Sequence, residues 1–573
     1  MPSEAADARA WWKEEIVYQI YPRSFSDSDG DGIGDLRGIA GRLDHLVELG
    51  VGIVWLCPVY VSPQVDNGYD VSDYRAIAPE FGTMDDFDRL VREMRARGLR
   101  LVMDLVFNHS SDKHDWFRSA RASRESPYRD YYIWRDSADG GPPNDWRAVF
   151  GGGAWSWNAP TGDWYFHIFA PEQPDLNWEN PQLRRELWDI MRFWAGKGVA
   201  GFRLDVVSFF SKKPFDAPQR GGIFPFYANG PKIHDYLREM RREVLDPLGL
   251  MSVGEAPGVT AEEAPFYVDP ARGELDMIFH FDHAGIDRTP EDFWKPAPWR
   301  LADLKGILSR WDLALAGRGW NSLYLGNHDL PRLLSRFGDT GNHRAAAAKL
   351  FATLLLTLRG TPYIYQGDEI GMINTPFETV ADYRDIVARN GWAAAQAEGR
   401  AEHEFLADHI LVSRDHARTP MQWDATAHGG FTSGEPWIRT NPDFTGTNVA
   451  AQRADPDSVF HYYRRMIALR KATPALVHGD YVPIDAGHPD VFAYVRMLDD
   501  VLLLVVLNVS GREAPVGDLG RDGIGLIGNY DGRPPILRPF EARVLRMAED
   551  LDALSSPACL LGEADPEYSG LDR

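Results

Sequence analysis

The chain has 573 residues, of which 44% are hydrophobic and 25% charged, so its composition is that of a globular enzyme and not of a disordered chain. Lys and Arg number 61 and Asp and Glu number 84, which gives a formal net charge of −23. Such a charge repels nucleic acid and anionic membranes, so we expect neither as a partner, and it suits a neutral substrate.

The N-terminal stretch, the longest aliphatic run and the cysteines indicate the cellular compartment of the protein. The N-terminal stretch lacks the basic segment followed by an apolar segment that marks a secretory signal. The longest aliphatic run, 501–507, is far shorter than the roughly 20 residues that a membrane helix needs. Cys57 and Cys559 are too few and too far apart for a disulfide framework or a zinc motif, and Cys57 is expected to be a buried thiol. These features predict a cytoplasmic protein, and we expect a monomer.

Short apolar runs that end in polar residues alternate with helical stretches along most of the chain. The eight runs are 16–21, 52–60, 99–107, 198–207, 250–255, 274–282, 322–329 and 361–368. Amphipathic helical spacing marks 84–97, 181–197 and 233–244, and the apolar helical runs 305–315 and 345–358 are expected to pack on the barrel. Eight strands alternating with helices predict an α/β fold, a (β/α)8 TIM barrel whose active site lies at the C-terminal ends of the strands.

Two regions depart from this alternation. The stretch after the third run is too long for an ordinary loop and is rich in Gly, Pro, Trp and Tyr, so it predicts a small inserted domain. Strands at 491–496, 501–509 and 542–546 predict a C-terminal antiparallel β domain, with a further strand at 481–484 that Pro483 would confine to an edge. The predicted division is 1–109 for the first part of the barrel, 110–170 for the inserted domain, 171–476 for the rest of the barrel, 477–549 for the C-terminal β domain and 550–573 for an acidic tail.

Three carboxylates, Asp205, Glu255 and Asp329, end predicted barrel strands. Because the C-terminal ends of barrel strands meet at one face, these side chains are expected to converge on one pocket. Glycoside hydrolysis uses a pair of carboxylates, and carboxylates that lie close together raise one pKa. Arg203 precedes Asp205 by two residues on a strand, so both face the same side and the guanidinium can keep the carboxylate ionised. A single such Asp would more often belong to an ion pair or a helix cap, but the set of three indicates a glycosidase site.

Four segments resemble motifs of the α-amylase superfamily of glycoside hydrolases: DLVFNH at 104–109, GFRLD at 201–205, VGE at 253–255 and GNHD at 326–329. QPDLN at 173–177 and ARTPMQW at 417–423 narrow the resemblance to the oligo-1,6-glucosidase and sucrose isomerase branch, and it extends over nearly the full length. The resemblance implies a retaining mechanism with Asp205 as the nucleophile, Glu255 as the general acid/base and Asp329 as the stabiliser of the transition state.

The resemblance also implies a pocket for a terminal glucose. The expected substrate-binding residues are Asp66, Tyr69, His109, Phe169, Gln173, Arg203, Val206, His328 and Arg418. The two histidines would bind the glucose hydroxyls, with buried core histidines as the alternative. Tyr69 would supply the stacking face, with Phe169 and Gln173 nearby, and Asp66, Tyr69 and Arg418 would close the far end of the pocket.

Val206, directly after the expected nucleophile, would lie beside the sugar on the other side of the cleaved bond. Its stiff, branched side chain would crowd an acceptor linked through a ring hydroxyl more than one linked through the flexible C6 arm. In the resembling family, Val at this position accompanies α-1,6 preference. The alternative is that Val206 is simply a residue that favours a strand.

The segment 27–35 is rich in Gly and carries acidic residues at its positions 1, 3, 5 and 9, a spacing that can wrap a hard cation. Gly38 stands where an EF-hand requires Glu, so this is not an EF-hand, and a solvated acidic turn is the alternative. Related enzymes carry a calcium-type site here, so we expect a structural Ca2+, or Mg2+, and no organic cofactor. The expected ligands are Asp27, Asp29, Asp31, the carbonyl of Ile33, and Asp35.

Three functions are compatible with these residues. The first is an exo-acting α-glucosidase that cleaves α-1,6 and other α bonds in short oligosaccharides or disaccharides. The second is a sucrose isomerase or transglucosidase that forms trehalulose or isomaltulose on the same scaffold. The third, a non-catalytic binding module, would be expected to have lost the carboxylates that are all present here. The first two differ in how the aglycone site treats water, and we expect segments 330–339 and 377–407 to shape that site.

Overall fold

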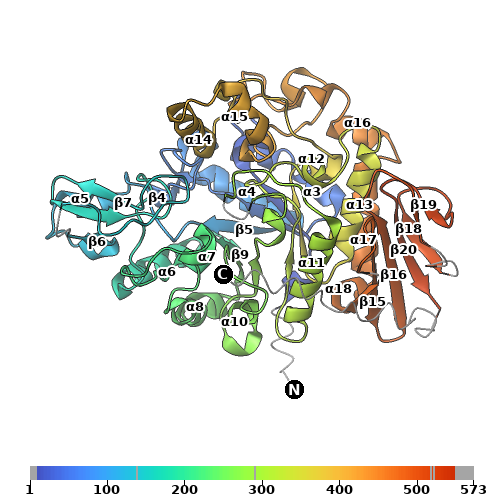
Figure 1. The fold of residues 1–573 in the computed structure, drawn as a ribbon, viewed down its shortest axis with the longest axis horizontal. Helices are drawn as coiled ribbons and strands as arrows, with labels where there is room; N and C mark the ends of the chain where they lie inside the picture. The colour runs from blue at the N-terminus through green and yellow to red at the C-terminus, as the bar shows by residue number, and fades with distance from the viewer. Residues whose placement is uncertain are drawn as a thin grey trace.

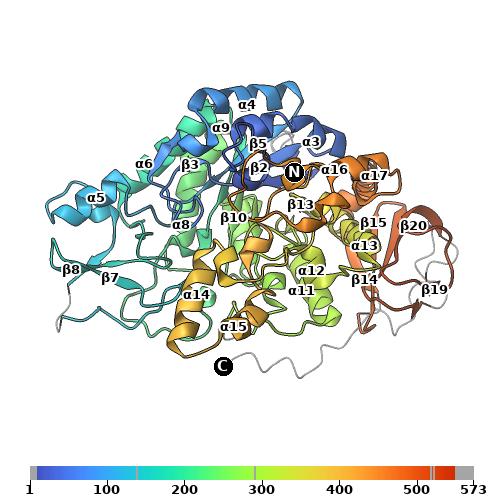
Figure 2. The same cartoon turned by 90° about the horizontal axis from the view of Figure 1, so that it is seen from above.

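A computed structural model describes residues 10–136, 140–289, 292–484, 486–516, 519 and 523–548. Its centre is a sheet of eight parallel strands in the order β11-β10-β9-β5-β2-β1-β13-β12 (Figures 1 and 2). The strands are β1 (Val17–Ile20), β2 (Ile53–Leu56), β5 (Arg100–Leu105), β9 (Gly201–Leu204), β10 (Met251–Glu255), β11 (Met277–Phe279), β12 (Ser322–Leu323) and β13 (Thr361–Tyr365). Each of them lies inside one of the eight predicted runs, so the predicted (β/α)8 barrel is confirmed.

The barrel closes between β11 and β12 through side chains, because these two strands form no backbone ladder in the described part of the chain. The Ser322 hydroxyl donates to the Ile278 carbonyl at 2.6 Å, and the Tyr324 hydroxyl donates to the His280 carbonyl at 2.6 Å. Only two residues of the predicted run 322–329 therefore pair as a strand. The remaining residues of that run turn toward the face where the site lies.

Helices lie around this barrel and its loops (Figure 2). They are α2 (Leu36–Ala40), α3 (Leu43–Leu49), α4 (Met84–Ala96), α6 (Pro181–Gly196), α7 (Ile223–Tyr227), α8 (Ile233–Met240), α9 (Asp246–Leu248), α10 (Ala264–Val268), α11 (Leu301–Leu315), α12 (Leu333–Phe337), α13 (Arg344–Thr357), α14 (Ile386–Ala397), α15 (Glu402–His409), α16 (Val449–Ala454), α17 (Val459–Ala472) and α18 (Pro474–His478). The start of α4 illustrates the local signal, since Thr83 and Asp86 cap each other's backbone N–H groups. The apolar helix α13 buries ten of its 14 residues, and α11 buries seven of its 15 along one face, which confirms that both are packing elements.

The inserted region follows the third barrel strand and contains α5 (Asp115–Ala122) and a three-stranded antiparallel sheet in the order β6-β8-β7. Its strands are β6 (Trp134–Arg135), β7 (Trp155–Asn158) and β8 (Asp163–Phe166), and they lie at the left edge of Figure 1. Trp146 packs edge-on against Phe166 and against Phe226 of α7, so this sheet shares its core with the barrel loops. The insertion is thereby confirmed, and its bounds 110–170 stay a prediction.

The C-terminal sheet is antiparallel, in the order β14-β15-β16-β20-β18, and lies at the opposite side of the molecule (Figure 1). Its strands are β14 (Asp480–Ile484), β15 (Val491–Leu498), β16 (Val501–Asn508), β18 (Ile524–Gly528) and β20 (Ala542–Met547), and two short pairs, β3 (Tyr60–Val61) with β4 (Asp73–Ile77) and β17 (Ala514–Pro515) with β19 (Ile536–Leu537), complete the strands. Pro483 lies in β14 at the edge of the sheet, as predicted. Buried Arg496 ties the sheet to the barrel by donating to the carbonyls of Leu476 and Gly479.

The remaining predictions about the whole chain have mixed outcomes. Cys57 is buried, as expected, whereas Cys559 and the predicted tail 550–573 lie outside the described residues. Within the residues that the structure covers, no helix combines the length and the apolar character that crossing a bilayer requires. The cytoplasmic location and the monomeric state stay predictions.

Candidate active site

A pocket opens at the carboxyl ends of the barrel strands, where a TIM barrel places its active site. The pocket has an empty volume of about 700 Å³, open solvent included, which is within the range of small-molecule sites. Its lining residues are Asp66, Tyr69, His109, Val149, Phe150, Phe169, Asp205, Val206, Phe224, Glu255, Pro257, Phe281, Ala284, Phe293, Trp294, Tyr324, Asn327, Asp329, Leu330 and Arg414. The three predicted catalytic carboxylates therefore do converge on one pocket.

Arg203 holds three carboxylates together at the floor of this pocket. Its Nη1 lies 2.7 Å from Asp104 Oδ1 and 2.7 Å from Asp205 Oδ1, and its Nη2 lies 2.7 Å from Glu255 Oε2. The expectation that Arg203 and Asp205 face the same side is confirmed. One guanidinium cannot neutralise three carboxylates, since full ionisation would leave a charge of −2 in a buried site.

Burial is the main influence on the pKa values of Asp205 and Glu255. Burial raises the pKa of Glu255, Arg203 opposes that rise, and the charge of Asp329 adds to it. The pKa of Asp205 is also raised by burial and by Glu255, against the lowering effect of Arg203. A cluster of this kind retains a proton at a pH at which isolated carboxyl groups have lost theirs, which is what a general acid requires.

Val206 links the two carboxylates through its backbone. Its N–H donates to Glu255 Oε2 at 3.1 Å, so the residue after Asp205 contacts the expected acid/base directly. The backbone of Val206 is left-handed, with φ 34° and ψ 47°, a conformation that is a genuine outlier for a β-branched residue. Such strain persists where the surroundings impose it, and here it turns the valine side chain into the pocket wall.

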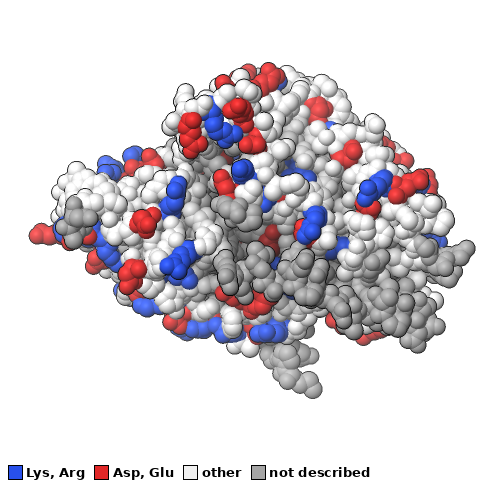
Figure 3. Space-filling view, viewed as in Figure 1, with Lys and Arg blue, Asp and Glu red and all other residues white. Residues whose placement is uncertain are grey.

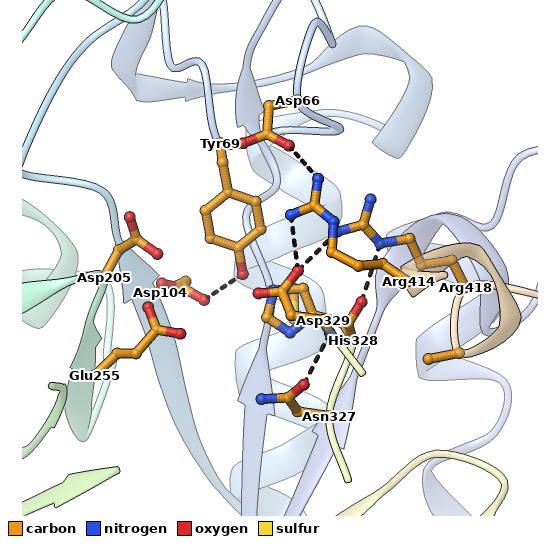
Figure 4. A network of polar contacts seen from close by, with 12 residues as sticks. Asp66, Tyr69, Asp104, Asp205, Glu255, Asn327, His328, Asp329, Arg414 and Arg418 are labelled. Atoms are coloured by element: carbon orange, nitrogen blue, oxygen red, sulfur yellow. Dashed lines mark hydrogen bonds and ion pairs between the residues drawn. The ribbon is translucent and has the colours of Figure 1, made fainter. Parts of the chain in front are cut away.

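Asp329 lies across the pocket from this cluster, on the other side of Tyr69 (Figure 4). Its Oδ1 accepts from Arg414 Nη1 at 3.1 Å and from Arg418 Nη2 at 2.8 Å. Burial alone would raise the pKa of Asp329, but His328 and the two arginines hold it far below the ordinary range. Asp329 is therefore a fixed negative charge that faces the pocket.

Arg414, and not Arg418, contacts Asp66, which corrects the expectation that Arg418 closes the far end of the pocket. Arg414 Nη2 lies 3.1 Å from Asp66 Oδ1 (Figure 4). Its Nε and Nη2 also lie 2.8 Å and 2.5 Å from the carboxylate oxygens of Asp385. Arg418 is fully buried behind Asp329 and donates to the His328 carbonyl at 3.0 Å. Arg414 was not predicted from the sequence, because it lies three residues before the ARTPMQW motif and not within it.

Tyr69 lines the pocket's inner end, and His328 stacks behind it. Their rings stack with centroids 5.2 Å apart and planes 10° apart, and the Tyr69 hydroxyl donates to Asp104 Oδ2 at 2.9 Å. Burial lowers the pKa of His328 to about 3, so its imidazole is neutral near pH 7. If the Gln19 amide donates to His328 Nδ1 at 2.8 Å, the N–H is on Nε2, which lies 3.2 Å from Asp329 Oδ2.

His109 and Gln173 stand at the same end. Burial lowers the pKa of His109 to about 4, and this neutral ring lies with Nε2 2.8 Å from the Tyr69 carbonyl. Gln173 donates to Asp66 Oδ2 at 3.1 Å, and the Phe169 ring lies 5.1 Å from that of His109. All nine expected substrate-binding residues thus lie at or directly behind the pocket, with His328, Gln173, Arg203 and Arg418 in the layer behind.

Four partly exposed aromatic side chains of the pocket lining, which we call the aromatic mouth, were not predicted from the sequence. They are Phe224, Phe281, Phe293 and Trp294, and they stand outside any motif. Among the described lining residues, the predicted segment 330–339 contributes Leu330 and the segment 377–407 contributes none. The second segment instead supports the wall from behind, because Asn390 of α14 donates to the Phe150 carbonyl at 3.1 Å.

The acidic loop after β1 brings together three of the four predicted carboxylate ligands. Oxygen atoms of Asp27, Asp29 and Asp35 all lie within 4.8 Å of one another, which fits a hard cation. Asp31 stands outside this group, and its Oδ1 accepts from the Ile33 N–H at 2.8 Å. The roles of Asp31 and of the Ile33 carbonyl as ligands stay predictions.

Comparisons with known proteins agree with this geometry. Residues 19–479 match the family described as "Alpha amylase, catalytic domain". An oligo-1,6-glucosidase of Parageobacillus thermoglucosidasius is 50% identical over 558 residues, 94% of this chain and 99% of that protein, and a trehalose-6-phosphate hydrolase of Escherichia coli (strain K12) is 46% identical over 540 residues, 93% and 98% of the two chains. The crystal structure of isomaltulose synthase from Klebsiella sp. LX3 superimposes with a TM-score of 0.91 at 43% identity, covering 94% of this chain and 99% of that one. The chain therefore belongs to the α-amylase family of glycoside hydrolases.

Proposed function

We propose that the protein is a retaining, exo-acting α-glucosidase that prefers α-1,6 bonds in short oligosaccharides. The observation that carries this proposal is the closed inner end of the pocket, where the ion pair between Asp66 and Arg414 leaves side chains only 7% exposed. A pocket that ends in this way accepts the terminal sugar of a chain and has no room for a chain that continues beyond it. The oligo-1,6-glucosidase relative supports the same substrate class.

In the proposed mechanism Asp205 attacks the anomeric carbon of the terminal glucose while Glu255 gives its proton to the departing glycosidic oxygen. The bond to the aglycone breaks as the bond to Asp205 Oδ forms, so a covalent glucosyl-enzyme results. Glu255, now ionised, then removes a proton from a water molecule that attacks the same carbon and releases Asp205. Asp329 stabilises the positive charge that develops on the sugar ring in both steps, because its neighbouring arginines keep it ionised.

Bond preference rests on Val206. Its strained backbone fixes the valine side chain in the wall beside the two carboxylates. A stiff apolar group at this point leaves less room for a leaving sugar bound through a ring oxygen than for one bound through the exocyclic C6 arm. This steric argument supports the α-1,6 preference.

A second candidate, a sucrose isomerase, is favoured by the aromatic mouth. Phe281, Phe293 and Trp294 offer flat apolar faces that can retain a released sugar long enough to be captured again by the glucosyl-enzyme. The isomaltulose synthase likeness agrees with this candidate. Both candidates share the first chemical step and differ only in whether water or the leaving sugar attacks in the second.

A phosphorylated disaccharide, the substrate named for the Escherichia coli relative, fits the pocket poorly. Among the described lining residues Arg414 is the one cation, and it is already engaged by three carboxylates. A phosphate group would meet an excess of negative charge there. On the face shown in Figure 3, basic and acidic groups are interspersed and form no basic patch.

The deciding experiment incubates the enzyme separately with isomaltose, maltose, sucrose and trehalose 6-phosphate and resolves the products by chromatography. The proposal predicts that glucose release is fastest from isomaltose. Trehalulose or isomaltulose as the main product from sucrose would favour the isomerase, and no release from any α-glucoside would overturn both.

We further propose that the loop of Asp27, Asp29 and Asp35 holds a structural Ca2+ or Mg2+. Burial alone would raise the pKa of Asp27, but donors from Thr432, Gly30 and Gly32 lower it overall, so this carboxylate is ionised and available to a cation. The loop supplies no residue to the pocket lining. A cation bound there would therefore support the fold and take no part in the chemistry.

A further inference from the structure

Asp70 is a buried carboxylate for which the catalytic proposal has no use. It follows Tyr69 and is fully buried, and among the described residues no Lys, Arg or His forms an ion pair with it. An ionised carboxylate in such a place requires other partners. They come from one short segment, because Oδ1 accepts from Ser62 Oγ at 2.9 Å and from the Asp66 N–H at 3.1 Å, and Oδ2 accepts from the Val65 N–H at 3.0 Å.

The segment that Asp70 holds has a backbone that ordinary residues avoid. Gln64 and Asn67 have φ values of 65° and 49°, in the left-handed region. Conformations of this kind persist only where neighbouring groups impose them. The successive N–H groups of Val65 and Asp66, directly after left-handed Gln64, form a concave site for an anion, and the Asp70 carboxylate is the anion that fills it.

The same segment carries Asp66, whose side chain closes the inner end of the pocket. Asp66 Oδ1 faces Arg414 and Oδ2 accepts from Gln173, so both of its oxygens have defined partners. These partners orient the side chain, whereas the hydrogen bond to Asp70 fixes the backbone from which that side chain projects. Without the anion, the buried N–H group of Asp66 and the partly buried N–H group of Val65 would each lose this acceptor.

We propose that Asp70 is a positioning residue for substrate recognition: it acts through Asp66 to set the closed end of the pocket that grips the terminal sugar. This inference rests on the proposed α-glucosidase function. Burial raises the pKa of Asp70 to about 7, against the lowering effect of its hydrogen bonds, so the role belongs to the carboxylate form and the assays that test it are run above this pKa. No part of this role requires Asp70 to touch the substrate.

The test is Asp70→Asn, assayed with p-nitrophenyl α-D-glucopyranoside. An amide keeps the size of the side chain but turns an N–H donor toward the N–H group of Val65 or Asp66, so the segment shifts. Loss of a contact made equally in the ground and transition states raises KM and leaves kcat nearly unchanged. We expect KM to rise about 10- to 100-fold and kcat to change less than about threefold, from the usual loss on leaving a buried donor without its acceptor.

A double-mutant cycle separates positioning from general destabilisation. If Asp70 acts through Asp66, then Asp70→Asn should raise KM less than about twofold in an Asp66→Asn background, because interacting residues do not add. Asp312→Asn is the matched control, since Asp312 is also buried and pairs with Arg359 away from the pocket lining. It should lower Tm without moving KM.

The outcomes are distinct. An unchanged KM in folded Asp70→Asn, or a KM rise that adds fully to that of Asp66→Asn, overturns the inference while leaving the α-glucosidase proposal intact. Failure of the unmutated enzyme to cleave the substrate defeats the proposed function instead. If Asp70→Asn does not fold, Ser62→Ala removes one of the three donors, and its KM should rise by a smaller factor with the same dependence on Asp66; a KM equal to that of the unmutated enzyme would then overturn the inference.

Discussion

Arg414→Lys is the most informative single change, because Arg414 joins three carboxylates at the closed end of the pocket. The guanidinium reaches Asp66 and Asp329 at 3.1 Å each and Asp385 at 2.5–2.8 Å through two nitrogens. A lysine ammonium keeps the charge but is a single compact donor, so it cannot serve all three partners. Asp66 and Asp329, the two of these carboxylates that line the pocket, would together lose at least one charged hydrogen bond. Such a bond is worth about 2–3 kcal/mol, and so roughly 30- to 150-fold in kcat/KM.

The assay measures kcat/KM on isomaltose and on p-nitrophenyl α-D-glucopyranoside, with Tm recorded for each protein. Arg344→Lys is the control, since Arg344 pairs with Asp443 and lies outside the pocket lining. It should change kcat/KM less than about threefold, as substitutions away from a site usually do. If Arg414→Lys kept kcat/KM within threefold of the unmutated enzyme, the role given to the Asp66–Arg414 pair would be refuted.

Three further predictions follow from the site. Val206→Thr should shift the ratio of kcat/KM for isomaltose over maltose toward maltose by tens of fold at most, since a methyl-sized change is worth about 1–3 kcal/mol; an unmoved ratio would assign the preference to another residue. Chelation, or Asp29→Ala, should lower Tm more than kcat at moderate temperature, because a ligand bound only to the folded state stabilises it independently of the chemistry; immediate loss of turnover at constant Tm would contradict a structural ion. Glu255 must be protonated to act and its pKa is raised, so activity is expected to persist above the ordinary Glu range and to fall as pH rises through that raised pKa. Glu255→Gln, assayed with α-glucosyl fluoride, whose leaving group needs no acid, should lose this alkaline limb, and an unchanged limb would assign it elsewhere.

The barrel was predictable because its signal is local. Each strand is a short apolar run with polar residues at its end, and the order of such runs along the chain fixes which ends share one face. Asp205, Glu255 and Asp329 could therefore be placed together before any coordinates. The edge position of β14 was equally local, since Pro483 lacks the N–H that a central strand needs.

Features that depend on geometry between loops could not be predicted. Arg414 and Arg418 are four residues apart in the sequence and have the same side chain, and only the fold decides which of them reaches Asp66. Asp31 has the spacing of a cation ligand, yet its carboxylate stands outside the group that Asp27, Asp29 and Asp35 form. The aromatic mouth could not be predicted, because Phe and Trp side chains outside a motif are more often packing residues than parts of a binding site.

The central claim is that Asp205 forms a covalent bond to the glucosyl group, and trapping that intermediate tests it most directly. The enzyme would be treated with 5-fluoro-α-D-glucosyl fluoride, digested and analysed by mass spectrometry. The mechanism predicts one added 5-fluoroglucosyl group on the peptide that contains Asp205, and no adduct in Asp205→Asn, whose kcat should fall by several powers of ten, on the order of 5 kcal/mol. An adduct on another carboxylate, or an Asp205→Asn enzyme with near-native turnover, would contradict the account.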